Sequence, residues 1–192
     1  MKNSEFITGA VPITKEEVRA LVLSKLQLKG KKRMVDVGAG TGTVGIEAAL
    51  SYEDLEVIAI ECQEAALRLT QQNIEKFSLS NIKLIAGYAP ICLEEQVDAI
   101  FLGGTGGKLQ EMMKWSYESL VEGGKIVANF IIVETFYEAM KRMEEVGFKE
   151  LEVTQVSISK LESLGKGKYL KPENPIFMIC LLYTSPSPRD GA

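Results

Sequence analysis

A glycine-rich segment and a carboxylate beyond it could form one binding site in this chain. The segment "DVGAGTG", residues 36–42, stands between a Val-rich run and a helix-like pattern. Glycines at such a junction allow a tight turn and a close approach of the backbone to a ligand at a helix amino terminus. Glu61 ends the next apolar run, where a carboxylate can accept hydrogen bonds from ribose hydroxyls. Together they predict a site for a nucleoside-containing cofactor.

The spacing of the glycines separates two classes of cofactor. A dinucleotide site favours G-x-G-x-x-G, but Thr43 stands where the third glycine would be, and the spacing here is G-x-G-x-G. This favours S-adenosylmethionine over NAD, although any parallel sheet also needs turns at such a junction. The candidate cofactor residues of this part of the chain are Asp36, Gly38, Ala39, Gly40, Thr41, Gly42 and Glu61.

A second glycine-rich segment, "GGTGG" at residues 103–107, follows a later apolar run and precedes another helical pattern. Its backbone N–H groups, free of side chains at a helix start, would make a concave anion site with room for a bulky ligand. An N/D-P-P-Y motif, which positions a target nitrogen in many methyltransferases, is absent here. We therefore expect a large substrate that carries carboxylates, and the candidate residues are Gly104, Thr105, Gly106 and Gly107.

Composition excludes several function classes. The chain has no histidine and three isolated cysteines, so we expect no His-ligated metal, no Ser-His-Asp triad and no disulfide framework. The formal net charge of -4 argues against a nucleic-acid partner. No apolar run has the length of a signal peptide core or of a membrane span, so we expect a cytoplasmic protein without a membrane partner.

Alternating apolar runs and helical patterns must position these segments. The strands are expected at 34–37, 56–60, 82–86, 97–102 and 125–131, and the helices at 15–27, 43–51, 63–77, 107–120 and 134–146. This order predicts an α/β fold with a doubly wound, mostly parallel sheet.

The end of the chain departs from this alternation. Residues 148–159 and 174–183 predict a terminal antiparallel hairpin joined by a loop over 160–173. We expect a single domain over 1–183. The segment "TSPSPRDGA", 184–192, lacks periodicity and is expected to be a non-native or disordered tail.

The residues together resemble a known family. "DVGAGTG" and Glu61 are similar to motifs one and two of class I S-adenosylmethionine-dependent methyltransferases. Further segments, "EFITGAVPITKEEVRA", "GYAP", "GGTGGKLQE", "VETFYEAM" and "NPIFMICLLY", resemble the decarboxylating C-15 methyltransferases of corrin biosynthesis, the CbiT-type proteins. The resemblance extends over nearly the whole chain up to Tyr183.

This resemblance implies a Rossmann-like sheet of seven strands, mostly parallel, with a C-terminal antiparallel hairpin and helices on both faces. It implies transfer of a methyl group from S-adenosylmethionine to a meso carbon of cobalt-precorrin-6B in anaerobic cobalamin biosynthesis. A ring-C acetate side chain also loses its carboxyl group as carbon dioxide. It also implies a homotetramer and a partner protein for C-5 methylation. No side chain is identified as catalytic.

Two alternatives stay open at this point. A class I methyltransferase could act on protein or RNA, although neither an N/D-P-P-Y motif nor a basic face supports this. The chain could also be a non-catalytic subunit that binds the cofactor or a tetrapyrrole.

Several further residues have two interpretations each. Thr14 is expected to cap the first helix through the capping box "TKEE", and the resemblance adds a cofactor contact. Tyr88 stands where many relatives carry an acidic residue; it could stack on the adenine or simply pack, and the backbone N–H of Ala89 is the expected adenine contact.

The remaining candidates concern the substrate. Asn129 could line the cleft or bind a neighbouring backbone group, and Glu134, with Thr135, could face a ligand or only start a helix. Lys168 belongs to a group of lysines that would attract carboxylates or lie solvated in a loop; the others are Lys160, Lys166 and Lys171. Met112, Met113 and Trp115 are expected in the core or a subunit contact rather than at the substrate.

Overall fold

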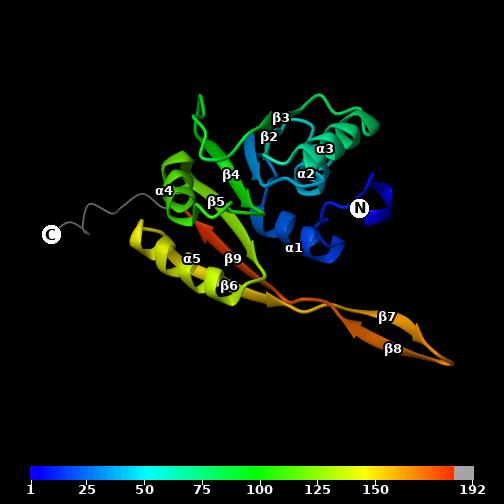
Figure 1. Cartoon of the computed structure of the whole chain (residues 1–192). Coiled ribbons are helices and arrows are strands. Elements are labelled where there is room, and N and C mark those ends of the chain that lie inside the picture. Colours follow the sequence, from blue (N-terminus) through cyan, green and yellow to red (C-terminus); the bar gives the residue numbers. More distant parts are fainter. Residues whose placement is uncertain (184–192) are drawn as a thin grey trace.

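The alternating pattern forms one seven-stranded sheet in the computed structural model, which describes residues 1–183, and of Lys149 and Glu150 only the backbone (Figure 1). The tail expected at 184–192 lies outside the described residues. The strands of the sheet are β1 (Arg33–Val37), β2 (Glu56–Glu61), β3 (Ile82–Ala86), β4 (Val97–Leu102), β5 (Leu120–Phe130), β6 (Lys149–Val156) and β9 (Ile176–Leu182).

The strand order is β3-β2-β1-β4-β5-β9-β6. Neighbouring strands from β3 to β5 pair in parallel, and β9 pairs antiparallel with β5 on one side and β6 on the other. This confirms the predicted mostly parallel sheet with a C-terminal antiparallel hairpin. The order reverses between β1 and β4, and open α/β sheets bind ligands beyond the carboxyl ends of the strands at such a point.

Helices cover both faces of the sheet, as expected (Figure 1). They are η1 (Asn3–Glu5), α1 (Glu16–Leu26), α2 (Thr43–Ser51), α3 (Glu64–Lys76), α4 (Leu109–Ser119) and α5 (Val133–Glu145). In β1, Val35 packs in the cluster that contains Met112 and Met113 of α4, whereas Met34 packs with Val22 of α1 on the opposite face. Successive side chains of a strand point to opposite faces, so β1 is buried from both sides.

The segment 160–173 is not a loop, and this prediction was wrong. It forms the strands β7 (Ser159–Leu164) and β8 (Gly167–Pro172), which pair only with each other and project from the body as an arm (Figure 1). Gly165, at φ 59°, begins the two-residue turn between them. Two-residue hairpin turns favour glycine at positive φ, and "LGKG" carries this signal.

The first helix begins after Thr14, and the predicted cap was wrong. Lys15 is the residue before the helix and no side chain caps the first turn. The Thr14 carbonyl instead accepts a hydrogen bond from Arg19 at 3.1 Å. The Lys15 ammonium donates a hydrogen bond to the Asn174 carbonyl at 2.8 Å and forms an ion pair with Glu173 at 3.1 Å. Tertiary contacts thus fix this turn in place of a local capping box.

Around α4 the boundaries also differ from those expected. The helix begins at Leu109 rather than 107, because Gly106 and Gly107 have φ of 56° and 78°, outside the helical region. It ends at Ser119, and β5 starts at once at Leu120, ahead of the predicted 125. Within residues 1–183, no helix combines the length and the apolar character that crossing a membrane requires.

Candidate active site

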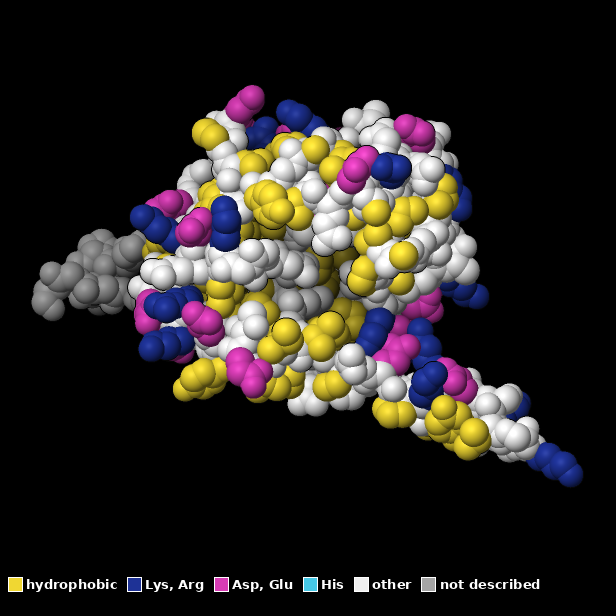
Figure 2. Space-filling view, viewed as in Figure 1, with side chains coloured by type: hydrophobic (Ala, Val, Ile, Leu, Met, Phe, Trp, Pro, Cys, Tyr) yellow, Lys and Arg dark blue, Asp and Glu magenta, His cyan; other side chains and the backbone are white. Residues whose placement is uncertain are grey.

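A cavity of about 440 Å³ opens beyond the carboxyl ends of β1, β2 and β4. Both glycine-rich segments line it, and so do residues 11–15 ahead of α1. Figure 2 shows the visible face hollowed near its centre, with hydrophobic side chains inside. The volume is in the range of small-molecule sites, and the position is that expected for an open α/β sheet.

The first glycine-rich segment is a turn that only glycines can make. Gly38, Gly40 and Gly42 have φ of 70°, 61° and 77°. A Cβ on Gly42 would lie 2.7 Å from Thr70 Cγ2 and 3.1 Å from Ile46 Cδ1. Gly38, Ala39 and Gly40 line the cavity, whereas Thr41 and Gly42 lie outside its lining. Of the predicted cofactor residues in this turn, Gly38, Ala39 and Gly40 can therefore touch a ligand, whereas Thr41 and Gly42 support the turn from behind.

Glu61 fixes this turn from the end of β2 and also reaches the cavity. Its Oε2 accepts a hydrogen bond from the Gly40 N–H at 2.8 Å. Its Oε1 accepts from the N–H groups of Cys62 and Gln63, both at 2.8 Å. A carboxylate offers about four acceptor positions. The three bonds leave one position for a ligand hydroxyl.

Two buried polar residues of α3, not identified from the sequence, hold the other side of the turn. Thr70 Oγ1 donates to the Gly40 carbonyl at 2.8 Å, and Asn73 Nδ2 donates to the Thr41 carbonyl at 3.2 Å. Both side chains are completely buried. They share a face of α3 with the buried Ala66 and Ile74. Polar residues on an otherwise apolar helix face were the signal that could have revealed them.

Asn73 also binds the amino-terminal segment that borders the cavity. Its Oδ1 accepts from the Ile7 N–H at 2.7 Å, and its Nδ2 donates to the Ile7 carbonyl at 3.0 Å. One amide thus joins the extended backbone at Ile7 to the glycine turn at Thr41. Downstream, Pro12 approaches the turn, since its carbonyl lies 3.5 Å from where a Cβ of Gly40 would be.

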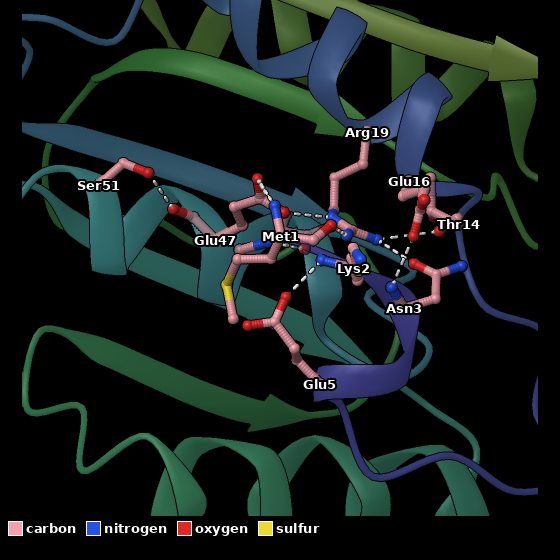
Figure 3. A network of polar contacts seen from close by, with 11 residues as sticks. Met1, Lys2, Asn3, Glu5, Thr14, Glu16, Arg19, Glu47 and Ser51 are labelled. Atoms are coloured by element: carbon pink, nitrogen blue, oxygen red, sulfur yellow. Dashed lines mark hydrogen bonds and ion pairs between the residues drawn. The ribbon is translucent and has the colours of Figure 1, made fainter.

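Arg19 of α1 provides the second anchor of this segment (Figure 3). Its guanidinium, fully buried, donates to the Met1 carbonyl and to Asn3 Oδ1 at 2.6 Å each. It also pairs with Glu47 of α2 at 2.5 Å. A buried guanidinium requires such a full set of acceptors. Arg19 also donates to the Thr14 carbonyl at 3.1 Å, so residues 11–15, which follow Ile7, are held beside the cavity.

Asp36 lies behind the turn rather than in the cavity. Its Oδ2 accepts the N–H of Gly45 in α2 at 2.8 Å, and its Oδ1 is buried without a hydrogen bond. Burial raises the pKa of Asp36 to about 7; the Gly45 N–H opposes this and the charge of Glu61 adds to it. The predicted cofactor contact of Asp36 is thus replaced by a link between β1 and the first turn of α2.

The second glycine-rich segment touches the first. The Gly103 N–H donates to the Val37 carbonyl at 2.9 Å, and a Cβ on Gly38 would lie 3.0 Å from the Gly104 nitrogen. Gly104 itself has open space around its missing Cβ and needs no positive φ. The fold therefore does not explain the glycine at 104, and the space beside it belongs to the cavity.

Only some of the substrate candidates meet at this cavity. Gly104, Thr105, Gly106 and Asn129 line it, and Asn129 Oδ1 is buried there without a hydrogen bond. Gly107 is not part of the lining. Glu134 lies exposed in the first turn of α5, and Lys168 lies exposed on β8 of the arm, both away from the lining.

The lining also includes the other cofactor candidates. Thr14 and Ala89 both border the cavity, and Tyr88 stands at its rim with 65% of its surface exposed, which contradicts a buried packing role. Met112 lines the cavity from α4, while Trp115 donates its indole N–H to the Ile91 carbonyl at 2.8 Å within the core. Lys108 lines the cavity too, and the sequence had not singled it out.

Comparison with known proteins assigns the chain to a family. The family described as "Precorrin methyltransferase domain" matches residues 6–182. The chain belongs to the precorrin methyltransferase family. Among its relatives, the cobalt-precorrin-6B C(15)-methyltransferase (decarboxylating) of Salmonella typhimurium is 44% identical over 180 residues. The match covers 93% of this chain and 94% of that protein.

Solved structures agree with this membership in the precorrin methyltransferase family. A precorrin-6y C5,15-methyltransferase from Geobacter metallireducens superimposes with a TM-score of 0.87 at 33% identity, over 95% of this chain and 97% of that one. The precorrin 8W decarboxylase of Methanobacterium thermoautotrophicum gives 0.85 at 32% identity, over 94% and 98%. The Rossmann-like methyltransferase fold predicted from the glycine motif is thereby confirmed.

Proposed function

We propose that this protein is an S-adenosylmethionine-dependent, decarboxylating C-methyltransferase that acts on cobalt-precorrin-6B at C-15. The observation that carries the proposal is one cavity bordered by both glycine-rich segments in a chain of the precorrin methyltransferase family. The relative from Salmonella typhimurium, at 44% identity, is named for this reaction. The same cavity thus has to hold both a nucleoside cofactor and a large substrate.

The residues around the first turn fit S-adenosylmethionine. Gly38, Ala39 and Gly40 present a backbone surface with no side chain larger than a methyl group, against which the methionine part can lie. Glu61 has one acceptor position left for a ribose hydroxyl. The backbone of Ala89 and the ring of Tyr88 border the place for the adenine, and Thr14 closes the opposite side. The cofactor supplies an electrophilic methyl group on a sulfonium.

The chain's own task is then to align the reacting carbon and to exclude water. Of the residues that line the cavity, twelve have aliphatic or aromatic hydrocarbon side chains, and these include Val37, Ile60 and Phe101. Methylation adds positive charge to the macrocycle, and breaking the bond to the departing carboxyl group returns an electron pair to it. The two changes cancel, so no strong base is required. This accounts for turnover by a chain without histidine.

Gly104, Thr105, Gly106 and Asn129 supply the substrate end of the cavity in this proposal. Asn129 Oδ1, buried without a hydrogen bond, has an acceptor free for a polar group of the macrocycle. Gly107 shapes the turn behind them, while Glu134 and Lys168 are left without a direct role. This is a narrower set than the sequence indicated.

Four further properties belong to the same proposal. We infer that residues 1–183 act as one domain, that the protein assembles as a homotetramer, and that a separate protein methylates C-5. We also infer that it works in the cytoplasm. The homotetramer and the separate C-5 methyltransferase extend the family resemblance, whereas the single domain and the cytoplasmic location extend the expectations from chain length and apolar runs.

The test uses purified protein, methyl-labelled S-adenosylmethionine and cobalt-precorrin-6B. We expect labelled macrocycle and carbon dioxide in equal amounts. If calorimetry shows that the cofactor binds but neither product forms, the proposed reaction is contradicted. If a protein or an RNA becomes labelled instead of the macrocycle, the enzyme is a methyltransferase of that other substrate class. Gel filtration with light scattering measures the assembly.

A further inference from the structure

Lys108 is an unpaired cation at the edge of the cavity. It precedes the first residue of α4 and ends the second glycine-rich segment. Within residues 1–183 its ammonium makes no hydrogen bond and no ion pair. A lysine that borders a cavity and whose ammonium has no partner can bind an anionic ligand.

The other charged side chains of the lining are already engaged. Lys15 pairs with Glu173 at 3.1 Å and donates to the Asn174 carbonyl at 2.8 Å. Glu61 accepts three backbone N–H groups. Lys108 is therefore the one uncompensated charge among the residues that line the cavity in the described part of the chain. An anion that enters this cavity therefore meets one cation, Lys108, that is not already paired.

A tight turn fixes the position of Lys108. Its N–H donates to the Thr105 carbonyl at 2.9 Å, and the residues between them, Gly106 and Gly107, both have positive φ. Such a turn is of the mirror-image type that glycine favours. The backbone of Lys108 is thus held at the rim, next to the open space beside Gly104.

We propose that the ammonium of Lys108 binds a carboxylate of the substrate that is retained in the product. This inference rests on the proposed function, in which the substrate is a tetrapyrrole with several carboxylate side chains. It assigns to Lys108 a role in substrate affinity and orientation. The acetate whose carboxyl group leaves as carbon dioxide lies elsewhere, toward the apolar part of the cavity.

The distinction between retained and departing carboxylate follows from charge. In decarboxylation the negative charge leaves the carboxylate as its carbon–carbon bond breaks and the electron pair enters the macrocycle. An ion pair with that carboxylate would stabilise the reactant and weaken in the transition state, which slows the step. An ion pair with a retained carboxylate is equal in both states and affects binding alone.

The experiment compares Lys108→Met with Lys114→Met. Lys114 lies on the same helix, 72% exposed, with only a loose pairing to Glu118 at 3.8 Å, and it does not line the cavity. Both variants lose one positive charge. We expect Lys108→Met to raise KM for cobalt-precorrin-6B about tenfold with kcat within about twofold, as the loss of one charge-assisted contact implies. Lys108→Arg should restore most of the affinity, and Lys114→Met should match the wild type.

Two further measurements separate this inference from the proposed function. Binding of cobalt-precorrin-6B is followed by its absorbance without cofactor, and cofactor affinity is measured by calorimetry. Weaker macrocycle binding in Lys108→Met alone, with cofactor affinity unchanged, supports the assignment even if the wild type shows no turnover. Equal macrocycle binding by the two variants overturns it, and so does a fall in kcat with KM unchanged.

Discussion

The two glycine-rich segments lie against each other but contain glycine for different reasons. Residues 38–42 are enclosed: a side chain at Gly42 would strike Thr70, and one at Gly38 would strike the backbone of Gly104. Gly104 and Gly107, in contrast, have open space where a Cβ would be. In the first segment, packing adds to the demand of the turn for glycine, whereas at Gly104 and Gly107 packing makes no such demand. Two segments of similar composition can therefore carry quite different physical constraints.

The largest effect is expected for Gly42→Ala, with Gly107→Ala as its control. Their φ values are 77° and 78°, so both variants suffer the same backbone strain, about 1 kcal/mol. Only at residue 42 does the new methyl also collide with neighbours, which adds about 2 kcal/mol. Urea unfolding should show a free energy lower by about 3 kcal/mol for Gly42→Ala. Equal losses in the two variants would remove the packing difference between the segments.

Asn73→Ala should destabilise the protein by about 2 kcal/mol, because it leaves buried backbone groups at Ile7 and Thr41 without partners. Cofactor affinity should fall with it, since the first turn loses a support. Gln71→Ala, at an exposed site of the same helix, is the control and should change the free energy of unfolding by less than about 0.5 kcal/mol. Urea titration and calorimetry measure the two effects. A cofactor affinity equal to that of the wild type in Asn73→Ala would show that the glycine turn keeps its conformation without the hydrogen bond from Asn73.

Asp36 makes the first segment sensitive to pH. Its pKa in the folded protein is about 7, above the value of about 4 in the unfolded chain, so the folded state holds the extra proton between these values. The contribution of Asp36 to stability is thus greatest below pH 4 and is lost as pH rises toward 7. Relaxation around an ionised carboxyl limits the change to about 1 to 2 kcal/mol.

Asp36→Asn removes this titration. The difference between the melting temperature of the variant and that of the wild type should become more positive as pH increases from 4 to 7. The control Asp54→Asn, at an exposed site, should show no such trend. A constant difference between Asp36→Asn and wild type across that range would mean that the carboxyl does not change its protonation there.

The smallest effect on stability is expected for Gly104→Ala, which adds a methyl group in open space at an ordinary φ. The melting temperature and cofactor affinity should stay at their wild-type values, and KM for cobalt-precorrin-6B should rise by a few-fold, with a larger increase in Gly104→Leu. Steady-state assays with the macrocycle varied measure this. If instead the melting temperature falls as it does in Gly42→Ala, the second segment is packed like the first.

The sequence predicted the order of strands and helices because apolar periodicity and glycine turns are local signals. It located Gly38, Gly40 and Glu61 by their spacing. It missed Asn73 and Arg19, since their partners lie far away along the chain, at Ile7, Thr41 and Glu47. It misplaced the start of the first helix for the same reason: contacts of Lys15 with Asn174 and Glu173, far along the chain, stand in place of the local capping box.

The substrate side was predicted less well than the cofactor side. Lys168 was selected by charge alone. The turn signal "LGKG" indicates a hairpin, but the direction of this arm, away from the cavity, depends on the folded chain (Figure 2). Lys108 was overlooked because its importance depends on which neighbouring charges are already paired. Which charges form ion pairs is a property of the folded chain, and a sequence motif does not show it.

The position of β9 between β5 and β6 has a consequence for how the protein is made. β6 joins the sheet only through β9, so it has no strand to pair with until Ile176–Leu182 has been synthesised. A nascent chain that has emerged as far as the arm carries two open edges, on β5 and on β6. Such edges invite pairing with other chains. Emergence of β9 is therefore the event that pairs both of these edges, and it leaves β3 and the outer side of β6 as the edges of the described sheet.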